Sequence, residues 1–312
     1  GCVITIYYLG KQIFPGVAGG IINSQSATDN HRSSILNTER ICFLAALILA
    51  TSIEFLTVSR RVSFDVLLTF FVTLSLFCFY TGYTRKERNT KFFLLSYMFM
   101  GIATLTKGPV GFAIPILVIS TFLCIVKFKN YQTEFRVRDM HIGLGGLIAF
   151  SIPLLWVLGI YLHGGWEHTK EVVFTQNIGR TVDSWSHNRP FYYFFIKFPL
   201  HFLPWSIFIP SVIIHYLKTI KVARGKQVTN GELDNNTMDS GNNPSPFLFP
   251  AVWFIVVFIF FSIMSGKRTM YILPLYPAAS LFVAWFLDSF ISFASDRKFK
   301  KIGYIPFKFV YS

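Results

Sequence analysis

Nine long runs of apolar residues constrain this chain more than any other feature of its sequence. They lie at residues 2–14, 41–58, 62–80, 92–105, 110–126, 142–162, 198–217, 247–264 and 270–293. A helix needs roughly 20 residues to cross about 30 Å of hydrocarbon, and most of these runs approach that length. The composition agrees, because 53% of the 312 residues are hydrophobic and only 14% are charged. The sequence therefore predicts an all-α polytopic bundle with at least eight membrane helices.

Two of these runs are short for a complete span. The first follows Gly1 without an initiator Met or a basic leader, so we expect the remnant of a helix in a truncated chain. The run at 92–105 is expected either to extend into neighbouring polar residues or to lie tilted or partly re-entrant.

Lysine and arginine recur in every second loop and predict the orientation of the bundle, because such residues stay predominantly on the cytoplasmic side. The basic loops carry Arg85, Lys86, Arg88 and Lys91; Lys127, Lys129, Arg136 and Arg138; Lys218, Lys221, Arg224 and Lys226; and Arg297, Lys298, Lys300 and Lys301. The intervening loops, at 59–62, 106–109, 163–190 and 265–269, are therefore predicted to be external. This topology explains the formal net charge of +14, since the basic residues form no single face for a nucleic acid.

Three polar segments connect the runs of one predicted membrane domain that covers residues 1–312. Residues 15–39 and 223–246 are rich in Ser, Asn and Gly and are predicted to be flexible cytoplasmic linkers. Residues 163–190 are predicted to form a long external loop. The sequence contains no internal repeat of the kind that marks many transporters.

The four cysteines lie inside apolar runs, without CxxC or metal-ligand spacing. We interpret them as packing residues, so neither a disulfide framework nor a zinc site is predicted. No external cluster has ligand spacing that identifies a metal, and the sequence indicates no cofactor. A divalent ion that assists a phosphate stays an open alternative.

Two carboxylates, Asp65 and Glu54, fall at the external ends of neighbouring runs. Charged side chains at membrane depth are costly and by default suggest a function. A structural role is the alternative for Asp65, since an acidic residue in the first turn of a helix is favoured by the helix dipole. In that role it would pair with Arg60 or Arg61.

Lys107 stands in the motif LTKGP, against the prevailing bias of basic residues toward the cytoplasm. Gly108 and Pro109 are expected to end one helix and begin the next, which leaves the ammonium group in a tight external turn. Such a turn can aim a cation at a buried anion. The alternative is a lysine that meets ordinary lipid headgroups.

Lys267 and Arg268 precede a run that Pro274 and Pro277 are expected to distort, and Tyr271 lies in the same segment. A point charge beside a planar guanidinium suits phosphate oxygens. The alternative is an aromatic and basic anchor at the membrane interface. The long external loop adds weaker candidates, among them Arg180, His187 and Arg189.

Together these residues describe one external site with several cations and one or two carboxylates next to the membrane. An anionic lipid is the natural ligand for such a site. With a sugar linked to polyprenyl phosphate, Lys or Arg would neutralise the departing phosphate, and a carboxylate would orient or deprotonate the incoming hydroxyl.

Four segments carry a resemblance to a known family: AALILATSIEFLTVSRRVSFDVLLTFF, GIATLTKGPVGFAIPIL, QNIGRTVDSWSHNRPFYYFFIKFPLHFLPW and SGKRTMYILPLYPAASL. In this order they resemble the protein O-mannosyltransferase superfamily, and more closely its bacterial branch, which includes the lipid A aminoarabinose transferase. LTKGP and KR-x-x-YILPLYP are the most specific elements. The resemblance covers residues 41–286.

The resemblance implies a GT-C fold and a transferase that takes a sugar from a polyprenyl phosphate. The acceptor would be a lipid, glycan or protein hydroxyl at the external face of a bacterial inner membrane. It implies that Asp65 is the second acidic residue of the site. Candidates for donor phosphate or sugar contacts are Lys107, Arg180, Lys267 and Arg268. His187 would lie at the edge of the cavity.

One departure from the family pattern affects the expected activity. The principal catalytic acid of the family lies in the first external loop, and this sequence lacks a match to it. We therefore expect that the chain as it stands could be an inactive fragment of an enzyme. The other alternative is a lipid or solute transporter, which predicts charges distributed through helix centres.

Overall fold

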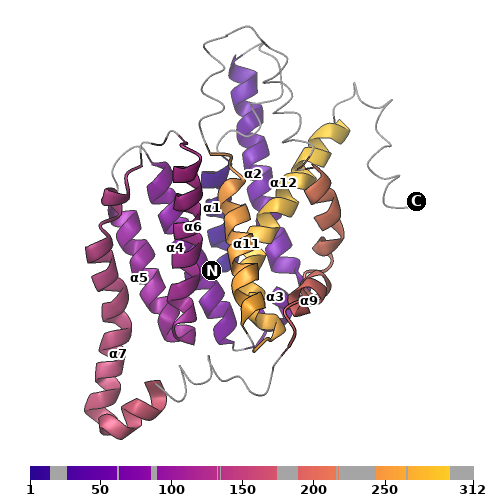
Figure 1. The fold of residues 1–312 in the computed structure, drawn as a ribbon. Coiled ribbons are helices and arrows are strands. Elements are labelled where there is room, and N and C mark those ends of the chain that lie inside the picture. Colours follow the sequence, from indigo (N-terminus) through magenta and orange to yellow (C-terminus); the bar gives the residue numbers. More distant parts are fainter. Residues whose placement is uncertain are drawn as a thin grey trace.

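The computed structural model describes residues 1–14, 27–61, 63–85, 90–131, 133, 135–173, 189–215, 217, 244–264 and 266–295, without the side chains of 27–36 and 293–295. The elements are α1 (Cys2–Ile13), α2 (Ala27–Thr51), α3 (Ile53–Ser59), α4 (Phe64–Thr84), α5 (Thr90–Lys107), α6 (Val110–Phe128), η2 (Val137–Met140), α7 (Ile142–Lys170), α9 (Tyr193–His201), η4 (Trp205–Phe208), α11 (Leu248–Ile263), η6 (Thr269–Leu275) and α12 (Tyr276–Ser295). The described part is a helical bundle (Figure 1), which confirms the predicted all-α class.

Four helical segments are long and apolar enough to cross a membrane: 64–84, 110–128, 137–173 and 269–292. The number rises to six if each of two bent helix pairs forms one span, and α11 is a shorter apolar helix. All nine apolar runs contain a helix, but the count of at least eight complete spans stays a prediction. The run at 92–105 does extend into polar neighbours, since α5 covers Thr90–Lys107.

Two runs that the sequence predicts as continuous spans are broken. The run at 41–58 bends by 64° between α2 and α3, and the run at 198–217 bends by 113° between α9 and the helix that begins with η4. At the first break Ser52 is extended, and its hydroxyl donates to the carbonyl of Leu49. At the second break Pro204 has no N–H to continue the helix.

Two predicted polar connections are partly helical, which corrects the sequence interpretation. Helix α2 begins at Ala27, so residues 27–39 are not a linker; α2 lies against α1 and α12, and Glu39 pairs with Lys11 at 3.3 Å. Helix α7 continues to Lys170 through a bend at Gly165, whose φ of 72° is accessible to glycine. Residues 163–170 are therefore helix instead of loop. Residues 223–243 lie outside the described part.

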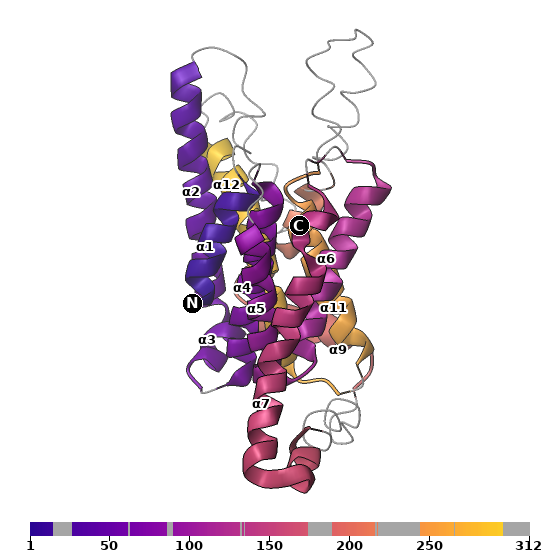
Figure 2. The same ribbon diagram turned by 90° about the vertical axis from the view of Figure 1, so that its left-hand side faces the viewer.

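The ends of the helices fall into two groups in Figure 1. The turns that join α3 to α4, α5 to α6 and α11 to η6 lie at the lower end, where α7 also ends. Seen from the side in Figure 2, the end of α7 extends beyond the other helices. Aromatic residues pack against one another in the core, where the rings of Phe122 and Phe249 meet edge to face with centroids 5.2 Å apart.

Candidate functional site

Asp65 and Lys107 form an ion pair between α4 and the last residue of α5. Asp65 is buried in the first turn of α4, where its backbone N–H donates to the Ser63 hydroxyl at 3.2 Å. The turn after Lys107 depends on Gly108, which has a φ of 67°, and on Pro109, the residue that caps α6. The sequence prediction that Lys107 projects from a tight turn toward an anion is thus consistent with the contacts.

Tyr271 completes this cluster from the other half of the chain. Its ring lies in η6, and the Lys107 ammonium stands 3.7 Å from the ring centroid. A cation on an aromatic face is stabilised by the ring quadrupole. Arg268 is exposed and lies close enough for its charge to act on both Lys107 and Tyr271. Four candidates, Asp65, Lys107, Arg268 and Tyr271, therefore come together.

The structural interpretation of Asp65 expected an ion pair with Arg60 or Arg61. Both are exposed at the end of α3. Asp65 pairs with Lys107 instead, because the turn between α5 and α6 brings that ammonium to the start of α4. The sequence correctly placed the carboxylate in the first helical turn, and its partner in the structure is Lys107 instead of the Arg60 or Arg61 of the structural alternative.

Lys267 is buried, and its ammonium group binds backbone carbonyls. It donates to the carbonyl of Arg189 at 2.9 Å and also to that of Met264. Desolvation lowers the pKa of the Lys267 ammonium from its ordinary value. Lys267 therefore ties the segment before α9 to the end of α11, and its predicted contact with a phosphate stays a prediction.

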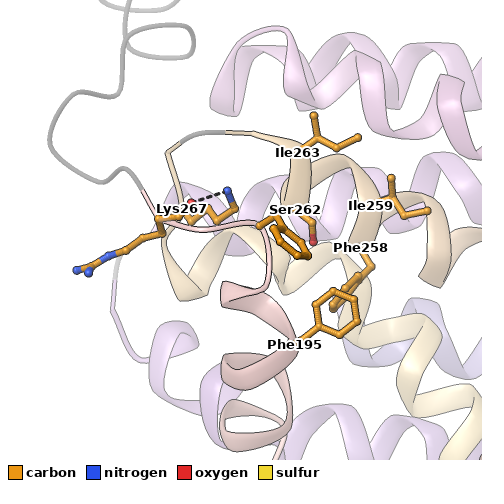
Figure 3. Close-up of a pocket in the computed structure, with 8 residues that line it drawn as sticks. Phe195, Phe258, Ile259, Ser262, Ile263 and Lys267 are labelled. Atoms are coloured by element: carbon orange, nitrogen blue, oxygen red, sulfur yellow. Dashed lines mark hydrogen bonds between the residues drawn. The ribbon is translucent and has the colours of Figure 1, made fainter.

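A cavity of about 370 Å³ opens beside this tie, between α9 and α11. Phe195 and Phe258 form its apolar wall with ring centroids 4.8 Å apart, and Lys267 lies beside them (Figure 3). Arg189 also lines the cavity. The wall also includes Ile259. An apolar pocket lined in addition by two cations has the character of a site for an amphipathic anion.

Glu54 has a partner that the sequence interpretation missed. Nδ1 of His201 lies 2.5 Å from Oε2 of the buried Glu54. The only sequence signal for this contact is a histidine within an apolar run, which is a weak one. The break between α9 and η4 determines where His201 faces, and the sequence interpretation did not include that break.

Two predicted site residues, Arg180 and His187, lie outside the described residues. Within the described part, no three His, Cys, Asp or Glu side chains are grouped as metal ligands. A divalent ion at the phosphate therefore stays an untested alternative.

Comparison with known proteins relates both the sequence and the fold to membrane glycosyltransferases. Residues 34–168 match the family described as dolichyl-phosphate-mannose-protein mannosyltransferase. An uncharacterized protein from Aquifex aeolicus is 31% identical over 277 residues, which cover 87% of this chain and 47% of that protein. The undecaprenyl phosphate-alpha-4-amino-4-deoxy-L-arabinose arabinosyl transferase 2 of Proteus mirabilis is 27% identical, with 84% of this chain and 42% of that protein covered.

The fold comparison agrees with the sequence comparison. The crystal structure of ArnT from Cupriavidus metallidurans bound to undecaprenyl phosphate superimposes with a TM-score of 0.61 at 18% identity. The match covers 92% of this chain and 46% of that one. The chain thus spans less than half the length of these relatives. The similarities confirm the resemblance predicted from the four sequence segments.

Proposed function

We propose that the protein containing this chain is a membrane glycosyltransferase like the bacterial aminoarabinose transferases to which the chain is similar. It transfers a sugar from a polyprenyl phosphate to a hydroxyl group of a lipid, glycan or protein. Undecaprenyl phosphate is the first carrier to test, since the relatives of known activity are named for it. The reaction takes place at the external face of a bacterial inner membrane.

The observation that carries this proposal is the cluster of Asp65, Lys107, Tyr271 and Arg268 at one end of the bundle. A departing polyprenyl phosphate carries negative charge, and two cations near one another can neutralise it as it develops. Lys107 is already oriented by a carboxylate on one side and an aromatic face on the other. The ammonium group is therefore held in the cluster before the phosphate binds.

Asp65 has two roles in this proposal. In the absence of donor it keeps Lys107 charged and directed toward the site. When the phosphate binds Lys107, the carboxylate is released to orient the acceptor hydroxyl and to receive its proton. The acceptor oxygen forms the new glycosidic bond, and the polyprenyl phosphate leaves with the electron pair of the broken bond.

The comparisons give no support to the transporter alternative. A path for ions or lipids would require charged groups along the centres of the spans. The described cluster instead joins the first turn of α4, the end of α5 and the short helix η6. This arrangement favours a site at one face.

The test is sugar release from a synthetic undecaprenyl phosphate sugar by the full-length protein in membranes. We expect Asp65→Asn and Lys107→Ala each to reduce turnover by about 100-fold, the scale of losing one oriented charge in a reacting site. Arg61→Gln, which removes a nearby exposed cation, serves as the matched control. Full turnover in both site variants would remove the cluster from the mechanism. No turnover by the wild-type protein with any donor would contradict the proposed function.

A further inference from the structure

The two bent spans meet at their breaks, which form a junction between α3 and α9. The backbone N–H of Ile53 donates to the carbonyl of Leu203 at 3.0 Å. The indole of Trp205 donates to the Thr51 hydroxyl at 2.9 Å. The first bond runs from the residue just after the break at Ser52 to the second break. The second bond runs from the residue just after Pro204 to the residue just before Ser52. The two bends are therefore docked to one another, and the Ile53 N–H is free for its bond because the helix breaks at Ser52.

Glu54 and His201 add a side-chain hydrogen bond at the same junction. Their side chains approach to 2.5 Å although the residues lie 147 positions apart in sequence. An imidazole N–H at Nδ1 of His201 can donate to the carboxylate oxygen of Glu54. Glu54 is only 6% exposed, and a carboxylate so buried is costly unless it is hydrogen-bonded. His201 supplies that bond.

Tyr276 covers the junction from the start of α12. Its ring meets the rings of Phe202 and Phe198 edge to face at 5.3 and 5.8 Å. Tyr276 directly follows η6, the element that carries Tyr271. Both α3 and α9 also contact η6. The junction therefore supports the short helix whose aromatic ring faces Lys107.

From this geometry we propose that Glu54 and His201 are a positioning pair, which holds η6 so that Tyr271 stays against the Lys107 ammonium. The proposal rests on the proposed function of the Asp65–Lys107 site. The pair acts through the docked breaks and η6 and makes no contact with substrate itself. A 3₁₀ helix depends on such support, because its hydrogen-bond geometry is poorer than that of an α-helix.

The first test measures kcat and the donor KM of the full-length protein. Glu54→Ala and His201→Ala are expected to lower kcat by about tenfold with little change in KM, because a displaced aromatic group affects the reacting geometry more than binding. Glu54→Gln keeps an oxygen that accepts from Nδ1 and is expected to restore most of kcat. A rise in KM alone would overturn the proposal, as would wild-type kcat in both alanine variants.

Hydrogen exchange gives a second readout that does not depend on turnover. Both alanine variants are expected to accelerate exchange in residues 53–59 and 269–275. Glu39→Gln removes a different interhelical pair, the exposed Lys11–Glu39 contact between α1 and α2, and should leave both segments unchanged. Unchanged exchange at 269–275 in the alanine variants would overturn the positioning role.

The two readouts separate this proposal from the proposed function. A wild-type protein without turnover contradicts the proposed function alone. In that case faster exchange at 269–275 in the alanine variants still supports the positioning of η6, and unchanged exchange overturns it.

Discussion

The Lys107 ammonium lies between a carboxylate and an aromatic face, and this placement sets the chemistry of the site. Asp65 provides the opposite charge and Tyr271 provides the quadrupole of its ring. Neither contact depends on the Tyr271 hydroxyl. A buried charge that lacks such partners is strongly destabilising.

Two substitutions of Tyr271 distinguish the stabilising contribution of the ring from that of its hydroxyl. Tyr271→Phe keeps the ring face and should unfold at the wild-type temperature, whereas Tyr271→Ala should lose about 1 kcal/mol of the cation–π contribution in addition to packing. Thermal unfolding in detergent measures both. Equal destabilisation by Phe and Ala would show that the hydroxyl, not the ring, is the stabilising group.

Lys267 should contribute to stability through the two carbonyls that it binds. Lys267→Met leaves the carbonyls of Arg189 and Met264 without this donor, which should cost about 1–3 kcal/mol. The matched control is Arg61→Met, which removes an exposed cation. Denaturant unfolding of the two variants compares the free energies, and equal values would contradict the role of Lys267 as a tie.

The sequence predicted which residues gather in the site better than it predicted their contacts. Asp65 and Lys107 are identifiable in the sequence because charges beside apolar runs are rare and because Gly108 and Pro109 predict a turn. The pairing of Asp65 with Lys107 follows from the packing of α4 on α5. The residues next to either one in the sequence do not specify this packing. For the same reason His201 was missed.

At the scale of elements, breaks in the helices place the functional residues. A hydrophobic run predicts that a helix is present, but hydrophobicity is insensitive to where the backbone turns within it. Pro204 and Pro274 are visible in the sequence, whereas the break at Ser52 also depends on a bond from Ile53 to Leu203 in another span. The bent spans could therefore not be predicted from local sequence alone.

The contact between α5 and α6 allows a sharp test of packing. A Cβ atom at Gly111 would lie 2.3 Å from the backbone of Ala103, so Gly111→Ala should force the helices apart at a cost of about 1–3 kcal/mol. Gly146 on α7 has no atom within 4 Å of an added Cβ. Gly146→Ala is the matched control and should not destabilise; similar unfolding temperatures for the two variants would contradict this packing.

At the scale of the whole molecule, loops rich in Lys and Arg alternate with loops that carry fewer of them, and the turns from α3 to α4, α5 to α6 and α11 to η6, all of the second kind, lie at one end in Figure 1. The apolar runs and this alternation predict most of the architecture, because the bilayer restricts spanning elements to helices with satisfied backbone groups. The side of the membrane that faces the site is a prediction of the charge rule alone.

Cysteine labelling tests this orientation. In a background with Cys124→Ser, which removes the exposed thiol of the described residues, Arg61→Cys should react with a membrane-impermeant maleimide in intact cells stripped of their outer membrane. Lys129→Cys, exposed at the end of α6, should react only after permeabilisation. The reverse pattern would place the candidate site on the cytoplasmic side.

The Asp65–Lys107 pair also has a consequence for biogenesis. Helices α4 and α5 are consecutive, and the pair joins the start of one to the end of the other. An unpaired charge at the centre of a span raises the free energy of membrane insertion by about 2.5–3.5 kcal/mol, and less near the interface. Because these two charges cancel at one end of the hairpin, α4 and α5 can leave the translocon together with this pair already neutralised. Assembly then begins with the polar centre of the site already formed.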